Sequence, residues 1–229
     1  MKYQFSSLKR SIFETFQNPK YSRPALNNLD HKLEKYLNFK NGFFIEAGAN
    51  DGYTQSNTYY LEKILGWRGI LIEGIPSLYN KCKTIRKKSS VYNCALVSQN
   101  FSDSYVEMHY ANLMSVVEGS LKNSKSQINH IEKGLKLQDI KQTYAIKVPA
   151  KTLESILDEF SDLPKIDFFS LDVEGYEVNV LKGLNLNKYK PRYILVEGIF
   201  FDEVNSFLES SYQLVEQLSF HDYFYQIKE

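Results

Sequence analysis

Residues 43–52, with the sequence FFIEAGANDG, decide the fold class of this 229-residue chain. Three bulky apolar residues at the start of the stretch are typical of a short strand buried on both faces, as in a parallel sheet covered by helices. Gly48 and Gly52 then allow a sharp turn of the backbone, and Asn50 between them tolerates left-handed geometry. Open α/β sheets bind nucleotide-like ligands at such turns, where a strand ends and a helix begins.

The charge at this turn indicates which kind of ligand it would hold. Glu46, Gly48 and Gly52 have the spacing acidic-x-Gly-x-x-x-Gly, which differs from the Gly-x-Gly-x-x-Gly pattern of pyrophosphate-binding folds. A carboxylate ahead of the turn repels a pyrophosphate and attracts a cation, and S-adenosylmethionine carries a sulfonium and an amino group. For the turn taken by itself, a glycine-rich corner without any ligand is the alternative.

A second apolar run at residues 69–72 predicts a neighbouring strand that ends at Glu73, 21 residues after Gly52. An acidic residue at the end of the second strand is where such folds hold ribose hydroxyls, because a carboxylate can accept a hydrogen bond from both at once. A purely structural role is less favoured, since burying a carboxylate beside Ile and Leu costs free energy unless a partner neutralises it.

Two later strands also end in acidic residues. Residues 166–171 form an apolar run that leads into Asp172 and Glu174, and residues 193–196 lead into Glu197. Because the carboxyl ends of parallel strands meet at one edge of a sheet, these acids and those of the first two strands should share one polar cleft. A helix cap or a solvated loop would explain any single acid, but it explains four poorly.

The flanking segments are expected to complete one domain over residues 1–229. Residues 1–40 predict a helical N-terminal extension that packs on the domain; dimer contact or docking to a membrane surface is the alternative. A third strand is expected at 91–97, and an antiparallel pair of strands at 212–218 and 222–227.

Residues 98–148 interrupt the regular alternation of strands and helices. Alternating patterns at 105–110 and 143–148 predict an antiparallel pair of strands, and the polar segment between them resembles no rigid element. Long connections of this kind are often functional. We therefore expect an insertion that could serve as a substrate lid.

Composition and charge exclude several partners. A net charge of +1 and a pI near 7.7 provide no global attraction to nucleic acid, and we expect the basic residues at 81–88 to form a solvated helix face. No apolar run reaches 18 residues and the start lacks a signal-peptide core, so no stable membrane insertion is expected. Cys82 and Cys94 have no metal-type spacing and are expected to be reduced, as in a cytoplasmic protein. The sequence leaves open whether the chain forms a homo-oligomer.

These motifs, in this order and spacing, resemble the FkbM-like family of S-adenosylmethionine-dependent methyltransferases. The resemblance covers about residues 43–200 and rests on the following stretches: Glu46 to Gly52 with Gln55 to Thr58, Leu71 to Glu73, Thr152 to Glu154, Asp172 to Glu177, and Leu181 to Gly183. It implies an α/β fold of the Rossmann-like class I methyltransferase type, with a mostly parallel seven-stranded sheet, helices on both faces and an antiparallel C-terminal hairpin. One departure is Glu73-Gly74-Ile75-Pro76, where the family usually has Glu-Pro-Asn-Pro.

The resemblance also implies S-adenosylmethionine as cofactor and a hydroxyl of a sugar, glycan or polyketide-type small molecule as methyl acceptor. The cofactor-binding residues it predicts are Glu46, Gly48, Asn50, Asp51, Gly52, Asn57, Glu73 and Asp172. A catalytically degenerate module that only binds or scaffolds is the alternative. A dinucleotide or nucleotide-sugar enzyme is disfavoured by the lack of Gly-x-Gly-x-x-Gly.

A base close to the acceptor should assist the reaction, because an aliphatic hydroxyl is a poor nucleophile at neutral pH. Asp172 and Glu174 are the first candidates, since neighbouring carboxylates raise one another's pKa. A helix-capping or cofactor-binding role is the alternative for either acid. His109, on a strand that enters the insertion, is the second candidate. Asp172 and Glu197 could together bind magnesium, but no third ligand is apparent and no metal site is predicted.

Overall fold

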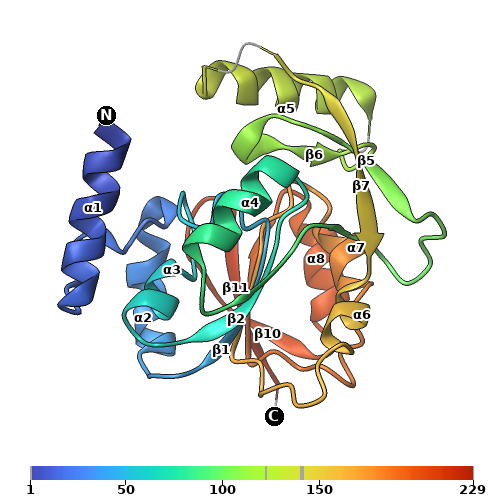
Figure 1. The fold of residues 1–229 in the computed structure, drawn as a ribbon. Coiled ribbons are helices and arrows are strands. Elements are labelled where there is room, and N and C mark those ends of the chain that lie inside the picture. Colours follow the sequence, from blue (N-terminus) through green and yellow to red (C-terminus); the bar gives the residue numbers. More distant parts are fainter. Residues whose placement is uncertain (1, 122, 140–141, 229) are drawn as a thin grey trace.

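The computed structural model describes residues 2–121, 123–139 and 142–228, and its centre is a seven-stranded sheet (Figure 1). The sheet has the order β10-β11-β9-β8-β1-β2-β3, in which β11 runs antiparallel to β9 and to β10 while the other neighbours are parallel. Its strands are β1 (Phe43–Ala47), β2 (Arg68–Ile72), β3 (Ser90–Tyr92), β8 (Phe168–Leu171), β9 (Tyr193–Glu197), β10 (Tyr212–Gln217) and β11 (Asp222–Ile227). This confirms the predicted class I methyltransferase architecture.

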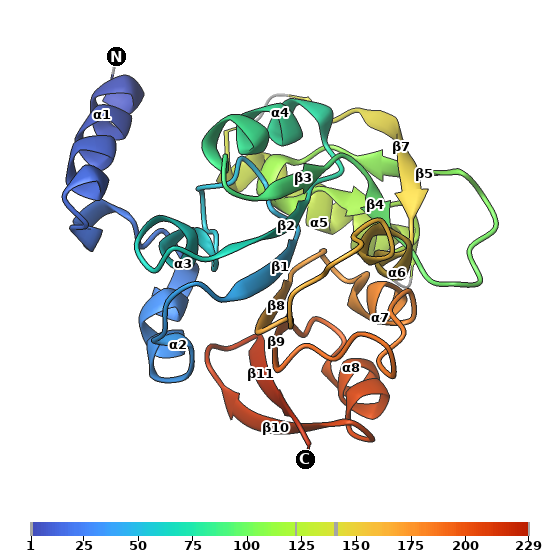
Figure 2. The ribbon, with the colours of Figure 1, turned by 60° about the horizontal axis from the view of Figure 1, so that its bottom comes forward.

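Helices cover both faces of this sheet, which explains why its central strands are mostly apolar (Figure 2). Along β1, Phe43 and Ile45 face one core and Phe44 faces the other, and all three are buried. The first core includes side chains of α6 (Leu153–Leu157), α7 (Glu177–Leu181) and α8 (Phe201–Leu208). The second includes side chains of α2 (Leu29–Leu37), α3 (Tyr59–Lys63) and α4 (Pro76–Ile85).

The N-terminal extension is helical as predicted, but only its second helix enters the core. Helix α2 follows two short 3-10 turns, η1 (Pro19–Tyr21) and η2 (Leu26–Asn28), and buries Leu29, Leu33 and Leu37. Helix α1 (Lys2–Thr15) lies apart from the sheet in both views of the ribbon (Figures 1 and 2). Its Leu8 and Ile12 are 60% and 49% exposed, and it contacts the domain mainly through polar groups: the Arg10 guanidinium lies 3.7 Å from the centre of the Tyr53 ring, and the Tyr59 hydroxyl donates to Glu14 at 2.9 Å.

The insertion forms a second, four-stranded sheet, in the order β4-β7-β5-β6. Its strands are β4 (Ala95–Leu96), β5 (Tyr105–His109), β6 (Val116–Val117) and β7 (Ala145–Lys151). The predicted antiparallel pair is confirmed, because Val106 of β5 lies opposite Val148 of β7.

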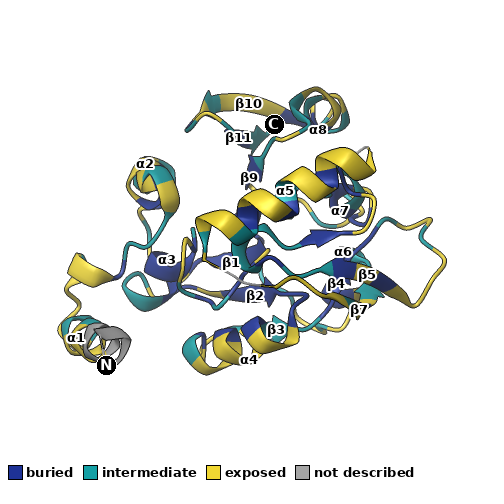
Figure 3. Ribbon diagram, turned by 90° about the horizontal axis from the view of Figure 1, so that it is seen from above, coloured by how far each residue is buried: buried dark blue, intermediate teal, exposed yellow. Residues whose placement is uncertain are grey.

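Two predictions about this region were wrong. The single strand expected at 91–97 divides into β3 of the first sheet and β4 of the second, because the Asn93 side chain donates hydrogen bonds of 2.8 Å to the carbonyls of Glu73 and Gly74 and redirects the chain. The middle of the insertion contains the 3-10 turn η3 (Asn112–Met114) and the 14-residue helix α5 (Ser124–Leu137), not an irregular segment. Most of α5 is exposed (Figure 3), so its apolar pattern is weak. Among the helices of the described ranges, none is long and apolar enough to cross a membrane.

Candidate active site

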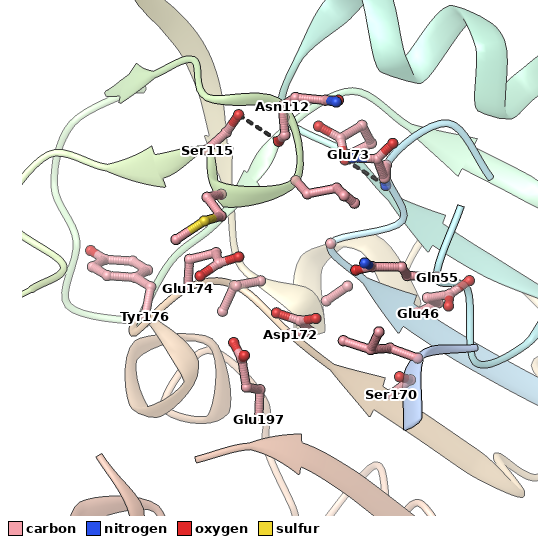
Figure 4. A pocket seen from close by; sticks show the side chains of 18 of the residues that line it. Glu46, Gln55, Glu73, Asn112, Ser115, Ser170, Asp172, Glu174, Tyr176 and Glu197 are labelled. Carbon is pink, nitrogen blue, oxygen red and sulfur yellow. Dashed lines mark hydrogen bonds between the residues drawn. The ribbon is translucent and has the colours of Figure 1, made fainter. Parts of the chain in front are cut away.

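A cavity of about 530 Å³ lies at the carboxyl ends of β1, β2, β8 and β9. This volume is within the range of about 300–1,000 Å³ that is usual for small-molecule sites. The four strand-end acids Glu46, Glu73, Asp172 and Glu197 all line it, together with Glu174. In Figure 4, Asp172 lies in the middle, with Glu174 and Glu197 on one side and Glu46 and Glu73 on the other. The sequence therefore predicted the location of the cleft correctly.

The turn after β1 brings the backbone of two strands into direct contact. Gly48 has a φ of +83°, and a Cβ atom there would lie 1.8 Å from the carbonyl oxygen of Asp172. Glycine is therefore required at this position by both conformation and space. Gly48 and Asn50 line the cavity, but Asp51 and Gly52 do not. Asp51 instead accepts hydrogen bonds from the backbone of Tyr53 and Thr54, and Gly52 packs against α4.

Glu46 belongs to a buried ion-pair network behind the cavity wall. Its carboxylate accepts hydrogen bonds from the Thr58 hydroxyl at 2.6 Å and from the Asn57 backbone at 3.0 Å, and lies 3.3 Å from a guanidinium nitrogen of Arg86. Arg86 is fully buried and also contacts Glu62 at 3.0 Å. The expectation that all basic residues of 81–88 are solvated was thus wrong for Arg86. Because Arg86 balances the charge of Glu46, this acid attracts a ligand cation less than the sequence suggested.

Glu73 is held at the cavity wall by two backbone N–H groups. Asn50 donates to Oε2 and Ile75 donates to Oε1, each at 2.7 Å. Burial raises the pKa of Glu73 to about 7, and these two hydrogen bonds oppose the shift. A carboxylate offers about four lone-pair directions, so acceptor capacity for ribose hydroxyls is left after both bonds.

The unusual Gly74-Ile75 pair therefore preserves the position of the Glu73 carboxylate. Gly74 also lies against the insertion, because a Cβ atom at this position would be 2.5 Å from the sulfur of Met108 on β5. A larger residue at 74 would require the Met108 side chain to move. The departure from the family pattern thus reflects how closely the insertion packs on the end of β2.

A cluster of three carboxylates, those of Asp172, Glu174 and Glu197, forms the other end of the cavity. One oxygen from each lies within 4.8 Å of the others. The Asp172 side chain faces the cavity but lies deep in the cleft. Desolvation at this depth, together with the charges of Glu197 and Glu174, raises the pKa of Asp172 well above its ordinary value. Burial and the charge of Glu174 raise the pKa of Glu197 to about 8. Three carboxylates at this spacing could hold a divalent cation, but such clusters also form without one, and we assign none.

The backbone at Glu174 is in an uncommon conformation. Its φ is +55°, and the next residue, Gly175, has a φ of +92°. The side chain of Glu177 stabilises this turn by accepting hydrogen bonds from the backbone of Gly175 at 2.9 Å and of Val173 at 3.2 Å. Left-handed geometry in a residue with a side chain costs free energy and is enriched at functional sites. Here it holds the Glu174 carboxylate beside Asp172.

Two histidines that the sequence did not single out also line the cavity. His130 of α5 places Nε2 3.1 Å from Glu174, and His221, in the turn between β10 and β11, places Nδ1 2.7 Å from Glu197. His130 could not be recognised because its helix was not predicted. Its position shows that the insertion contributes a titratable side chain to the cleft.

The structure places His109 outside the cavity, which corrects its prediction as a candidate base. Its neighbour Met108 lines the cavity, and adjacent residues of a strand point to opposite faces. His109 instead pairs with Glu118, with 2.5 Å between Nε2 and Oε2. Asn57, another predicted cofactor residue, does line the cavity and donates a hydrogen bond of 3.0 Å to Ser170.

The family comparison agrees with this geometry. A model of the methyltransferase FkbM domain matches residues 46–225, from the end of β1 into β11. The chain belongs to the FkbM methyltransferase family. As a member it is a methyltransferase of the S-adenosylmethionine-dependent class, and the match spans every acid of the cleft. No curated protein matches this FkbM methyltransferase in sequence.

Solved structures of similar overall arrangement are distant in sequence. A TehB-like S-adenosylmethionine-dependent methyltransferase from Corynebacterium glutamicum has 11% identity and a TM-score of 0.40, with 98% of this chain and 97% of that chain covered. An O-methyltransferase from Bacillus cereus in complex with S-adenosylhomocysteine has 10% identity and a TM-score of 0.43, with 89% and 80% covered. Matches at this level say nothing about the acceptor of the FkbM methyltransferase.

Proposed function

We propose that this FkbM methyltransferase transfers the methyl group of S-adenosylmethionine to a hydroxyl of a sugar, glycan or polyketide-type small molecule. The observation that carries the proposal is the cluster of Asp172, Glu174 and Glu197, with raised pKa values for two of its members, in the same cavity as Glu73. A carboxylate can accept the proton of a hydroxyl, and Glu174 lies in this cluster with His130 3.1 Å away.

The chemistry of the cavity wall fits the cofactor. Glu73, fixed by two backbone hydrogen bonds, would accept the ribose hydroxyls, and the turn of Gly48 and Asn50 would lie along the ligand. Asn57 and Asp172 would contact the polar end that carries the amino group and the sulfonium. When bound, the cofactor supplies an electrophilic methyl group in this cleft. A carboxylate-rich wall stabilises a cationic ligand, which favours binding of the sulfonium over a pyrophosphate.

The chain's own residues would then orient the acceptor and receive its proton. A carboxylate of the cluster would accept the proton that the hydroxyl loses when it is methylated. Glu174 is our candidate for this base, and Asp172 for a residue that serves both cofactor and acceptor. His130, which lies 3.1 Å from Glu174, could take the proton onward to solvent. Holding the hydroxyl in line with the methyl group supplies much of the remaining acceleration.

A degenerate binding module is the second candidate, and it draws support only from Gly74-Ile75. The Ile75 backbone donates to Glu73 at 2.7 Å, so this departure leaves the carboxylate in place. The predicted acids of the cleft are all present, which speaks against a non-catalytic module.

Methyl transfer from labelled S-adenosylmethionine to matched alcohol, amine and thiol acceptors tests the proposal. We expect label in the alcohol product, and a loss of about 10²–10⁴ in rate for Glu174→Gln. Glu118→Gln is the matched control, because Glu118 also pairs with a histidine but lies outside the cavity lining. Label in the amine or thiol alone would refute the hydroxyl assignment. Equal rates for both variants would refute the role of Glu174.

A further inference from the structure

The charged residues at the cluster end of the cavity are almost all acidic. Asp172, Glu174, Glu197 and Asp222 line this end, and Lys133 is the single Lys or Arg among the lining residues that the structure describes. Glu46, by contrast, is balanced by Arg86. Within residues 2–121, 123–139 and 142–228, no Lys or Arg ion pair involves any of the four acids. A negatively charged acceptor group at this end would therefore face four acids to which no described Lys or Arg is paired, and the two nearby histidines, His130 and His221, already lie 3.1 Å from Glu174 and 2.7 Å from Glu197.

Part of the exposed lining of the same cavity is apolar, beside the polar Thr54, Gln55 and Lys133. Four apolar lining side chains are exposed, with exposed fractions of 45% for Leu26, 70% for Leu137, 40% for Ile199 and 80% for Phe220. They come from four separate segments: η2, the end of α5, the loop after β9 and the turn between β10 and β11. Single exposed apolar residues are common on protein surfaces, but several that converge on one cavity mark a surface that a ligand covers.

From these two observations we infer that the methyl acceptor is amphipathic and carries no negative charge. Its hydroxyl-bearing head would lie against the carboxylates, and an apolar chain or ring would leave the cavity over Leu26, Leu137, Ile199 and Phe220. Sugar phosphates and nucleotide-linked sugars are poor acceptors on this account, because their phosphates would approach the cluster. The inference rests on the proposed function, since it assigns the acceptor of that same site.

Three glucosides that differ in the anomeric substituent test the inference. The protein, saturated with S-adenosylhomocysteine, is titrated with methyl β-D-glucoside, n-hexyl β-D-glucoside and β-D-glucose 1-phosphate. Each fully buried methylene strengthens binding by about fourfold. With five additional carbons partly covered by the apolar part of this lining, the hexyl compound should bind at least about tenfold more tightly than the methyl compound. Glucose 1-phosphate should bind most weakly.

Phe220→Ser and Leu137→Ser should each reduce the affinity for the hexyl compound and leave that for the methyl compound unchanged. Phe16→Ser is the matched control, because Phe16 is 78% exposed but lies outside the cavity lining. Equal affinities for the two alkyl glucosides, no detectable binding of either, or tightest binding of the phosphate would overturn the inference. The same samples separate the two proposals, since absence of S-adenosylhomocysteine binding contradicts the proposed function itself.

Discussion

Replacement of Gly48 by alanine should damage both the fold and the cofactor site. The added Cβ would lie 1.8 Å from the carbonyl oxygen of Asp172, and real Cβ contacts are essentially never shorter than 3.0 Å. Strands β1 and β8 would therefore have to separate by about 1.2 Å at this point. No rotamer change can relieve the contact, because the obstructing atom belongs to the backbone.

The expected cost follows from two contributions. Alanine at a φ of +83° costs about 1–2 kcal/mol. The separation of β1 from β8 would also stretch the hydrogen bond from the Asp172 backbone to the Ala47 carbonyl, now 3.2 Å. A lost hydrogen bond costs about 0.5–1.5 kcal/mol. Gly48→Ala should therefore lower the free energy of unfolding by about 1.5–3.5 kcal/mol.

Gly119→Ala is the matched control, because Gly119 has a φ of +79° but its Cβ would meet no atom within 4 Å. This variant should lose only about 1–2 kcal/mol. Urea unfolding can be followed by the fluorescence of Trp67, which is the single tryptophan and is fully buried. Equal losses of stability in the two variants would refute the claim that the ends of β1 and β8 are in backbone contact.

Further predictions concern the cofactor and the base. Glu73→Ala should weaken S-adenosylhomocysteine binding about ten- to a hundredfold in calorimetry, because hydrogen bonds to a charged acceptor contribute about 1.5–3 kcal/mol; unchanged affinity in a folded variant would remove Glu73 from the site. Since the pKa of Glu73 is raised to about 7 and hydroxyls donate to its deprotonated form, affinity should fall by up to about tenfold per pH unit below 7, and Glu73→Gln should lack this dependence. Asp172→Asn and Glu174→Gln should separate cofactor binding from methyl transfer. At least one of the two variants should keep cofactor affinity within a few-fold of the parent and lower the single-turnover rate of transfer about 10²–10⁴-fold. Parental rates in both variants would exclude a carboxylate base at this turn. His130→Gln should slow transfer and His109→Gln should not, because His130, unlike His109, contacts a cleft carboxylate; equal rates would show that this histidine of the insertion takes no part in the reaction.

The central sheet could be predicted from sequence because its signals are local. Each buried strand is mostly apolar, and the acid in its last positions or directly after it lies at the carboxyl end whatever the rest of the chain does. Glu46, Glu73, Asp172 and Glu197 therefore come together as expected. The strand at 91–97 could not be divided correctly, because the break depends on hydrogen bonds from Asn93 to a distant turn.

Contacts between distant segments account for what the sequence did not reveal. Arg86 pairs with Glu46 across 40 positions, and a basic residue in a basic stretch gives no sign of such a partner. Its spacing from buried Leu78 and Cys82, at successive four-residue intervals, was the one available signal that it faces inward. His130 lies on α5, a mostly polar helix that packs at the edge of the cleft, so its pairing with Glu174 required the structure.

Calorimetric titration of the purified protein with S-adenosylhomocysteine, and separately with NADH, tests the central claim most directly. Glu73 beside an acid-rich cleft without a Gly-x-Gly-x-x-Gly turn should hold the adenosyl ligand and reject the pyrophosphate of NADH. We predict saturable binding of S-adenosylhomocysteine with one site per chain and no heat of binding with NADH. Tight binding of NADH with no response to S-adenosylhomocysteine would contradict the account.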